Sequence, residues 1–166
     1  QFACPTLVDD IDRILADTSL DPSCLKLEIT ESAIMDNAET AIAVTEKLRS
    51  RGIHISIDDF GTGYSSLGYL HQFPVDTLKI DHSFVAQMQQ DQDSDYHVVE
   101  AIIALSQKLR IAVVAEGIEN TQQLKWLQQL GCEYGQGYLF SRPRPAEELT
   151  ELLNQSGSIT ALLARG

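Results

Sequence analysis

The amino-acid sequence predicts an α/β fold in which parallel strands form an incomplete (β/α)8 barrel. Short strand patterns alternate with amphipathic helical patterns about five times, and this alternation is typical of βα units and a parallel sheet. The alternation alone allows an open doubly wound sheet as well as a barrel. The barrel is favoured because each strand carries apolar residues at alternate positions and polar residues between them, whereas a strand covered by helices on both faces is apolar on both.

The two alternating sets of strand residues have different places in a barrel. The apolar set faces the surrounding helices, and functional residues gather at the C-terminal mouth. A complete barrel has eight strands and about 250 residues, so roughly the first third of such a fold is expected to be absent from this chain. The apolar set is Leu25, Leu27, Ile29, Ile53, Ile55, Ile57, Leu78, Ile80, Val113 and Ala115, and the polar set is Lys26, Glu28, His54, Ser56, Asp58, Thr77, Lys79 and Glu116.

Apolar residues at alternate positions predict the strands, and apolar residues three to four apart predict the helices. The expected strands cover 25–30, 53–58, 77–80, 111–115 and 134–139. The expected helices cover 6–16, 37–51, 64–70, 96–109, 120–130 and 145–154. Residues 1–154 are therefore assigned to one partial barrel domain, and residues 155–166 to a C-terminal tail.

Turn and capping residues mark the ends of these elements. The Asp21-Pro22-Ser23 turn separates the first helix from the first strand. Gly52 ends the second helix and Gly131 ends the helix over 120–130, because glycine adopts the left-handed conformation that closes many helices. Asn120 or Thr121 begins that helix as its N-cap.

Composition excludes several classes of protein. The formal net charge of −12 argues against a protein that binds duplex nucleic acid, which requires a basic face. A small phosphate ligand stays compatible, since bound cations reverse the local field. The cysteines Cys4, Cys24 and Cys132 form no CxxC pair, which disfavours a zinc knuckle or a disulfide framework and indicates a reduced, cytoplasmic setting. No apolar run reaches the ~20 residues of a membrane span, so any membrane anchor of the parent protein is expected outside this segment.

Two adjacent aspartates, Asp58 and Asp59, end the second expected strand and precede a loop with two glycines. Neighbouring carboxylates repel each other, and such a pair commonly has a cation beside it. A solvated turn is the alternative for an isolated pair. Each further acid taken alone is consistent with a surface group, and a lone strand lysine with protection of a sheet edge. These further residues at or near strand ends are Glu28, Glu31, Lys79, Glu116 and Glu119.

In a barrel these strand ends meet at one mouth, where clustered carboxylates repel one another unless metal ions are bound. Oxygen ligands favour Mg²⁺ or Mn²⁺ over Zn²⁺. Asp58 and Asp59, each reaching a different ion, would give the arrangement of two-metal phosphodiesterases. We expect the ions to lower the pKa of Lys79, which then orients or deprotonates the attacking water or stabilises developing charge. Gly61 and Gly63 allow the loop to approach a ligand or to act as a hinge.

Other polar residues give weaker signals. Gln136 and Tyr138 flank Gly137 at the end of the last strand, where contact with a ligand and structural packing are equally consistent with the sequence. The histidines show no metal-binding spacing such as HExxH. We expect His54 to pack in the interior and the other histidines, His82 among them, to lie on the surface.

Five motifs occur in an order that is similar to one known family. Together they resemble the EAL-type phosphodiesterases, which hydrolyse cyclic di-GMP in bacteria, and the resemblance extends over residues 1–154. It implies a (β/α)8 barrel with an antiparallel first strand, and metal-dependent opening of cyclic di-GMP to linear pGpG. The motifs are LEITES (27–32), IDDFGTGYSSL (57–67), LKID (78–81), AEGIE (115–119) and QGY (136–138).

Carried over position by position, the resemblance implies a role for each matching residue. Lys79 resembles the catalytic lysine near the attacking water, and Glu119 the second glutamate of the catalytic EGxE pair. Gln136 resembles the site glutamine of the last strand in that family. The metal-site residues implied are Glu28, Asp58, Asp59 and Glu116.

The loop after the aspartates also has a counterpart in that family. Glu31 resembles the glutamate that holds the loop containing Gly61, Thr62 and Gly63 in place. In the family this loop connects metal binding to dimerisation, and the helix after it contributes to the dimer contact. The resemblance therefore implies a homodimer formed through this loop and helix.

The chain departs from the family at its beginning, where neither the Glu-Ala-Leu strand nor a metal-binding Asn is found. We therefore expect the isolated chain to hydrolyse little or no cyclic di-GMP. We also expect another copy, a neighbouring molecule or rearranged helices to cover its open sheet edges. Sensor or diguanylate cyclase domains are common companions in the parent chains of this family.

Two non-enzymatic alternatives are weighed against a phosphodiesterase. One is a degenerate module that binds cyclic di-GMP or dimerises without catalysis, and the other is a purely structural interaction domain. The first is disfavoured because each identifiable acid and the lysine are retained, and the second does not explain the clustered acids.

Overall fold

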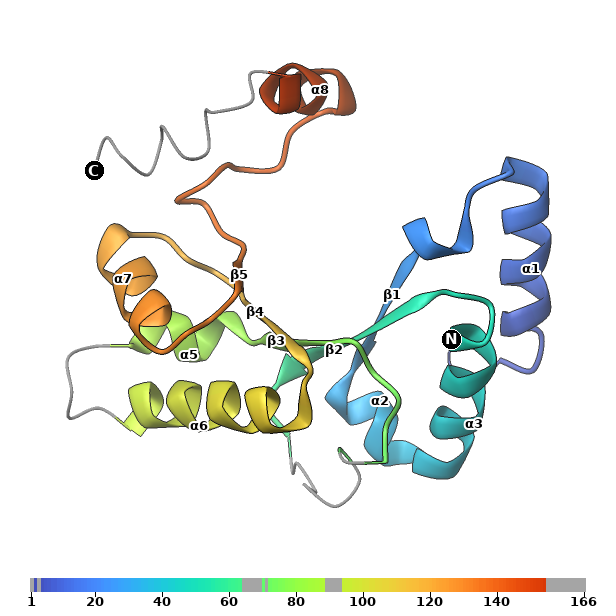
Figure 1. Ribbon diagram of the computed structural model, residues 1–166, viewed down its shortest axis with the longest axis horizontal. Coiled ribbons are helices and arrows are strands. Elements are labelled where there is room, and N and C mark those ends of the chain that lie inside the picture. The colour runs from blue at the N-terminus through green and yellow to red at the C-terminus, as the bar shows by residue number, and fades with distance from the viewer. Residues whose placement is uncertain (1, 3, 64–69, 71, 89–93, 155–166) are drawn as a thin grey trace.

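The computed structural model describes residues 2, 4–63, 70, 72–88 and 94–154 of the chain (Figure 1). Within them, five strands form one sheet in chain order, and every neighbouring pair is parallel. This arrangement confirms the predicted parallel α/β sheet. The strands are β1 (Lys26–Thr30), β2 (His54–Phe60), β3 (Thr77–Ile80), β4 (Ala112–Ala115) and β5 (Tyr134–Gly135).

The last strand is shorter than the predicted 134–139, because the chain turns away from the sheet at Gln136. The N–H of Gln136 donates to the carbonyl of Ala115, and the carbonyl of Gln136 accepts from Ile118. The N–H of Leu139 then donates to the carbonyl of Ile118. Gly137 passes so close to Ile118 that a Cβ atom at this position would lie 2.2 Å from the Ile118 carbonyl oxygen. The segment after β5 therefore pairs with the loop that follows β4.

The helices cover most of the predicted ranges, and two short ones are additional. Helices α2 and α5 are six residues long, too short to show helical periodicity in the sequence. Their N-caps are Thr30, whose hydroxyl oxygen accepts from the N–H of Ala33, and Asp81, whose carboxylate accepts from the N–H of Ser83. The helices are α1 (Leu7–Thr18), α2 (Glu31–Asp36), α3 (Ala38–Arg49), α5 (His82–Gln87), α6 (Ser94–Leu109), α7 (Thr121–Gln129) and α8 (Ala146–Asn154).

Two further expectations concern short segments between the elements. The predicted Asp21-Pro22-Ser23 turn contributes to a single 3₁₀ turn, Pro22–Cys24, in which the Asp21 carboxylate accepts from the N–H of Ser23. The helix expected over 64–70 lies, apart from Leu70, outside the described residues.

The hydrophobic core lies between the sheet and its helices. Figure 1 shows α2 and α3 beside β1 and β2, and α5, α6 and α7 beside β3, β4 and β5. Helix α3 packs on β2, and α6 packs on β3 and β4. Most of the predicted apolar set is buried in this layer, including Ile55, Leu78 and Ala115, each with no exposed surface. Among the described helices, none combines the length and the apolar character needed to cross a membrane.

Part of the polar set of strand residues is also buried at the centre of the sheet. Ser56, Thr77 and Lys79 are each less than a tenth exposed. The Lys26 ammonium donates to the Thr77 hydroxyl at 3.1 Å, and Lys79 contacts carboxylates at or near three other strand ends. The face that carries the predicted functional residues is thus a packed polar interior, as in a barrel.

Candidate metal centre and adjoining cavity

Lys79 lies at the centre of the predicted functional residues. The alternation of side chains along parallel strands places Glu28 of β1, Asp58 of β2 and Lys79 of β3 on one face of the sheet. The Lys79 Nζ atom lies 2.9 Å from Glu28 Oε2, 2.8 Å from Asp58 Oδ1 and 2.8 Å from Glu116 Oε1, at the end of β4. The three carboxylates accept from one ammonium group, which has three N–H donors.

These contacts determine the direction of the Lys79 pKa. Burial alone lowers this pKa, but hydrogen bonds to Asp58, Glu116 and Glu28 outweigh burial and raise it above its ordinary value. The predicted lowering of the Lys79 pKa requires cations bound beside the lysine. The carboxylates by themselves act in the opposite direction.

A β-bulge brings the adjacent aspartates to the same face of the sheet. Between Ile57 and Phe60 of β2 the register with β3 shifts, so that Asp58 and Asp59 together oppose Lys79. Asp59 has a φ of 54°, in the left-handed region that non-glycine residues seldom adopt. In a regular strand, two consecutive side chains would point to opposite faces.

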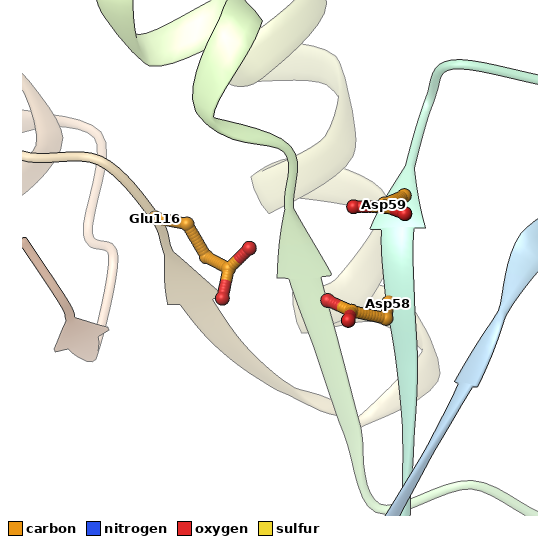
Figure 2. A group of neighbouring side chains, drawn as sticks. All are labelled: Asp58, Asp59 and Glu116. Atoms are coloured by element: carbon orange, nitrogen blue, oxygen red, sulfur yellow. The ribbon is translucent and has the colours of Figure 1, made fainter.

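Asp58, Asp59 and Glu116 form the candidate metal centre. One carboxylate oxygen from each lies within 4.8 Å of the other two. Figure 2 shows both aspartates projecting from β2 toward Glu116. The pKa of Asp59 is raised, first by burial and then by the negative charges of Asp58 and Asp81. The cluster therefore concentrates negative charge that a cation would neutralise.

The donor set of this cluster fits a hard divalent cation. All three ligand groups are carboxylates, and oxygen donors suit Mg²⁺, Mn²⁺ and Ca²⁺ better than Zn²⁺. The predicted metal residue Glu28 is not part of the three-residue cluster, and it reaches the centre through Lys79. The structure thus brings the predicted metal residues together, but only three of the four belong to the carboxylate cluster.

Glu31 forms hydrogen bonds with the loop that follows the aspartates. Glu31 is buried at the start of α2, and its Oε2 accepts from the N–H of Gly61 at 2.9 Å and of Gly63 at 3.4 Å. The Thr62 hydroxyl donates to the carbonyl of Asp59 at 2.8 Å. A Cβ atom on Gly63 would lie 3.2 Å from the Glu31 carboxylate. This loop therefore packs directly against the residue that anchors it.

A cavity of about 310 Å³ adjoins the metal centre and shares Glu116 with it. Its walls bring together the loop after β4, the start of α5 and the segment after β5. The predicted residues Glu119, Gln136 and Tyr138 line this cavity. His82 also lines it, although the sequence predicted only a surface position for this residue and no role in a site. The position of His82 directly after the LKID strand end was the available signal, because parallel strand ends meet at one mouth.

The fold and these side chains define an α/β barrel-type protein with a cluster of carboxylates, a candidate metal site, at the C-terminal ends of its strands. The chain belongs to the EAL domain family, whose model matches residues 1–143. The sheet of five parallel strands is thus an incomplete barrel of the EAL type, as the sequence predicted.

Characterised relatives and solved structures are similar over most of this chain. It is 49% identical over 148 residues to cyclic di-GMP phosphodiesterase NbdA of Pseudomonas aeruginosa, covering 89% of this chain and 19% of NbdA. The structure of the MucR phosphodiesterase in complex with cyclic di-GMP has a TM-score of 0.85 and 47% identity, over 89% of this chain and 60% of that one. The chain therefore spans less than two thirds of either protein.

A further similar structure contains a metal ion together with the dinucleotide. The Klebsiella pneumoniae BlrP1 complex with manganese and cyclic di-GMP has a TM-score of 0.77 and 33% identity, over 86% of this chain and 36% of that one. A BlrP1 complex with calcium and cyclic di-GMP is similarly related, with a TM-score of 0.78.

Proposed function

We propose that this chain is the larger part of a phosphodiesterase domain that hydrolyses cyclic di-GMP to linear pGpG. The observation that carries the proposal is the convergence of Lys79 with Asp58 and Glu116, beside Asp59, at one mouth of an EAL-type sheet. Cyclic di-GMP phosphodiesterases are among the relatives of this chain. In the reaction, water adds to one of the two phosphorus atoms and one P–O bond breaks.

Asp58, Asp59 and Glu116 would hold the metal ions, with Glu28 completing the carboxylate set. Mg²⁺ or Mn²⁺ would activate water and neutralise charge on the phosphodiester. Manganese and calcium in the BlrP1 complexes support a hard divalent cation for this family. The all-oxygen donor set supports Mg²⁺ or Mn²⁺ over Zn²⁺ in this protein.

Lys79 would act as a hydrogen-bond donor at the reacting phosphate. Its ammonium already donates to three carboxylates, and its side chain is only 9% exposed. A buried, protonated lysine can orient the attacking water and stabilise the negative charge that develops on phosphate oxygens.

Glu119, Gln136 and Tyr138 would contact the part of the dinucleotide next to the reacting phosphate. They line a cavity that adjoins the metal centre through Glu116. Pockets for small ligands commonly have volumes of about 300–1,000 Å³, and this cavity lies at the lower end of that range. One nucleoside of the dinucleotide is therefore its proposed occupant.

The loop of Gly61, Thr62 and Gly63 would link the metal centre to a homodimer contact. Thr62 bonds to the carbonyl of Asp59, and Glu31 bonds to both glycines, so a shift of the loop would act directly on a candidate metal ligand. Size-exclusion chromatography with light scattering, with and without Mg²⁺, tests this proposal. A monomer under both conditions would refute it.

The main test is hydrolysis of cyclic di-GMP by the protein at its full natural length, with Mg²⁺ or Mn²⁺. We expect chromatography to show pGpG as the product, and Asp59→Asn to abolish its formation. Glu100→Gln, which changes an exposed carboxylate of α6, is the matched control. Binding of cyclic di-GMP without hydrolysis by the unaltered protein would support the degenerate binding module instead.

A shorter protein tests which part of the domain is needed. A protein verified by mass to contain only residues 1–166 is expected to hydrolyse little or no cyclic di-GMP. The described strands place ligands on one side of the centre, and β1 has no strand neighbour beyond it among them. Full turnover by this shorter protein would contradict that expectation.

A further inference from the structure

His82 is held in a defined orientation at the edge of the candidate substrate cavity. Its ring Nδ1 lies 3.1 Å from Asp81 Oδ2, while Asp81 Oδ1 accepts from the N–H and the hydroxyl of Ser83. Gly117 makes room for this residue, because a Cβ atom there would lie 2.7 Å from the His82 Cβ. His82 is thus fixed against the loop that carries Glu116 and Glu119.

The hydrogen-bond partner of Nδ1 determines whether Nε2 of a neutral His82 donates or accepts a hydrogen bond. A carboxylate only accepts hydrogen bonds, so a neutral His82 carries its proton on Nδ1 and a lone pair on Nε2. Among the described residues, no hydrogen bond to Nε2 is found, and the side chain is 72% exposed. In this neutral form, His82 presents a hydrogen-bond acceptor to a ligand in the cavity.

The remaining walls add acceptors and a stacking surface. Glu119 contributes a carboxylate, and Gln136 an amide oxygen. The Arg142 guanidinium lies over one face of the Tyr138 ring, 4.4 Å from its centre. Tyr138 is nevertheless about half exposed. An aromatic ring with an open face stacks on a nucleobase. The cavity thus combines a base-stacking ring with several hydrogen-bond acceptors.

Such a lining distinguishes between purines. The guanine edge presents two neighbouring donors, its ring N–H and its amino group, whereas adenine presents an amino group beside a ring acceptor. Glu119, which is not part of the candidate metal cluster, would repel a free phosphate in the cavity, so the nucleobase rather than a second phosphate is the favoured occupant.

We propose that His82 is a base-recognition residue that accepts a hydrogen bond from a guanine stacked on Tyr138. This inference rests on the proposed cyclic di-GMP phosphodiesterase function, and it adds a residue and a specificity mechanism to it. His82 acts on binding and on the choice of base, and the reacting phosphate would lie at the carboxylate cluster of Asp58, Asp59 and Glu116.

The test measures binding and turnover in the protein at its full natural length. His82→Ala is expected to raise the KM for cyclic di-GMP about three- to tenfold, the value of one hydrogen bond, with little change in kcat. His82→Gln places an amide oxygen near the position of Nε2 and is expected to restore most of the affinity. His97→Ala, which removes an exposed histidine that also has a carboxylate neighbour, is the control and is expected to have no effect.

Base selectivity separates recognition from a structural role. Calorimetry in Ca²⁺, with the dinucleotide checked for integrity, gives the affinities for cyclic di-GMP and cyclic di-AMP. His82→Ala should reduce the preference for cyclic di-GMP, whereas a loss of folding would lower both affinities together and refute the proposal. Unchanged cyclic di-GMP affinity in His82→Ala would refute base recognition alone. No cyclic di-GMP binding by the unaltered protein would refute the phosphodiesterase proposal itself.

Discussion

The two ends of the parallel sheet carry similar residues but balance their charges differently. At the N-terminal end, Asp76 accepts from Arg49 at 2.9 Å and from the backbone N–H of Ile55 at 2.8 Å. His54 Nδ1 lies 3.6 Å from the same carboxylate, and this exposed position corrects the prediction that His54 packs in the interior. Each oxygen of Asp76 thus has a donor.

At the C-terminal end, one lysine faces an excess of acids. Lys79 bonds to Glu28, Asp58 and Glu116, and Asp59 adds a further carboxylate within reach of the cluster. Matched charges stabilise a fold, whereas an excess of one sign destabilises it and creates affinity for ions of the opposite sign. The N-terminal end therefore has the charge balance of a stabilising contact, whereas the C-terminal end has the excess of carboxylates that the proposed cation site requires.

The largest effect is expected when the positive charge of Lys79 is removed. Lys79→Met should lower kcat about 100- to 1,000-fold, because a positioned donor at the reacting phosphate is lost. It should also lower the free energy of unfolding by about 3 kcal/mol in the presence of a chelator, since partly buried carboxylates lose their partner. Adding Mg²⁺ or Mn²⁺ should reverse part of this destabilisation, which urea unfolding measures.

The exposed Lys108 of α6 offers a matched control for that variant. Lys108→Met should change neither activity nor stability. If Lys79→Met is as stable as the unaltered protein in chelator, the excess of negative charge at the C-terminal end does not lower the free energy of unfolding.

At the N-terminal end, Asp76→Ala should affect stability alone. The backbone N–H of Ile55 and the Arg49 guanidinium lose their acceptor, which should lower the free energy of unfolding by about 2 kcal/mol. The folded protein should keep its kcat, because this residue lies at the opposite end of β3 from Lys79. Asp17→Ala, at an exposed position of α1, is the control, and a loss of kcat in Asp76→Ala would undermine the division between the two ends.

Two glycines with positive φ allow the ends to be compared by the same substitution. Gly52, at the N-terminal end, has a φ of 87° and nothing near the position of a Cβ atom. Gly61, in the loop after Asp59, has a φ of 99° and the Phe84 ring 3.0 Å from that position. Both alanine variants should lose about 1 kcal/mol through backbone strain.

Only the variant at the C-terminal end should also lose activity. Gly61→Ala should displace the loop that Glu31 holds, and should lower kcat about tenfold, because misplacement of catalytic groups by as little as ~1 Å is costly. Thermal unfolding and steady-state kinetics on the two variants give the comparison. Equal activities in Gly52→Ala and Gly61→Ala would show that the loop does not act on the metal centre.

The smallest effect on stability is expected for Asp59→Asn. Unlike the substitutions above, it should raise the free energy of unfolding. Burial and neighbouring charges raise the pKa of Asp59 in the folded protein, so its ionised form is disfavoured there. Stability therefore rises as pH falls through the folded pKa and is reduced above it. In chelator at neutral pH, Asp59→Asn should raise the free energy of unfolding by less than about 1 kcal/mol, because water screens this partly exposed group. Destabilisation by Asp59→Asn would contradict the raised pKa.

The sequence by itself determined the parallel α/β architecture and the residues that gather at its C-terminal end. Strand 77–80 was predicted with its observed bounds, because alternation and β-branched residues are local properties of the chain. The family motifs identified the acids and Lys79, and the C-terminal ends of parallel strands necessarily meet at one edge. The turn at Gln136 was missed, because its hydrogen bonds are to Ala115 and Ile118, distant in the sequence.

Only the tertiary structure decided how these residues are used. Asp58 and Asp59 share a face because a bulge in β2 opposes both to Lys79, a register that depends on pairing with β3. The raised pKa of Lys79 depends on acids from three other segments of the chain. His82 lines the cavity because Gly117 makes room for it. Each of these features comes from contacts between residues far apart in the sequence, which local patterns do not record.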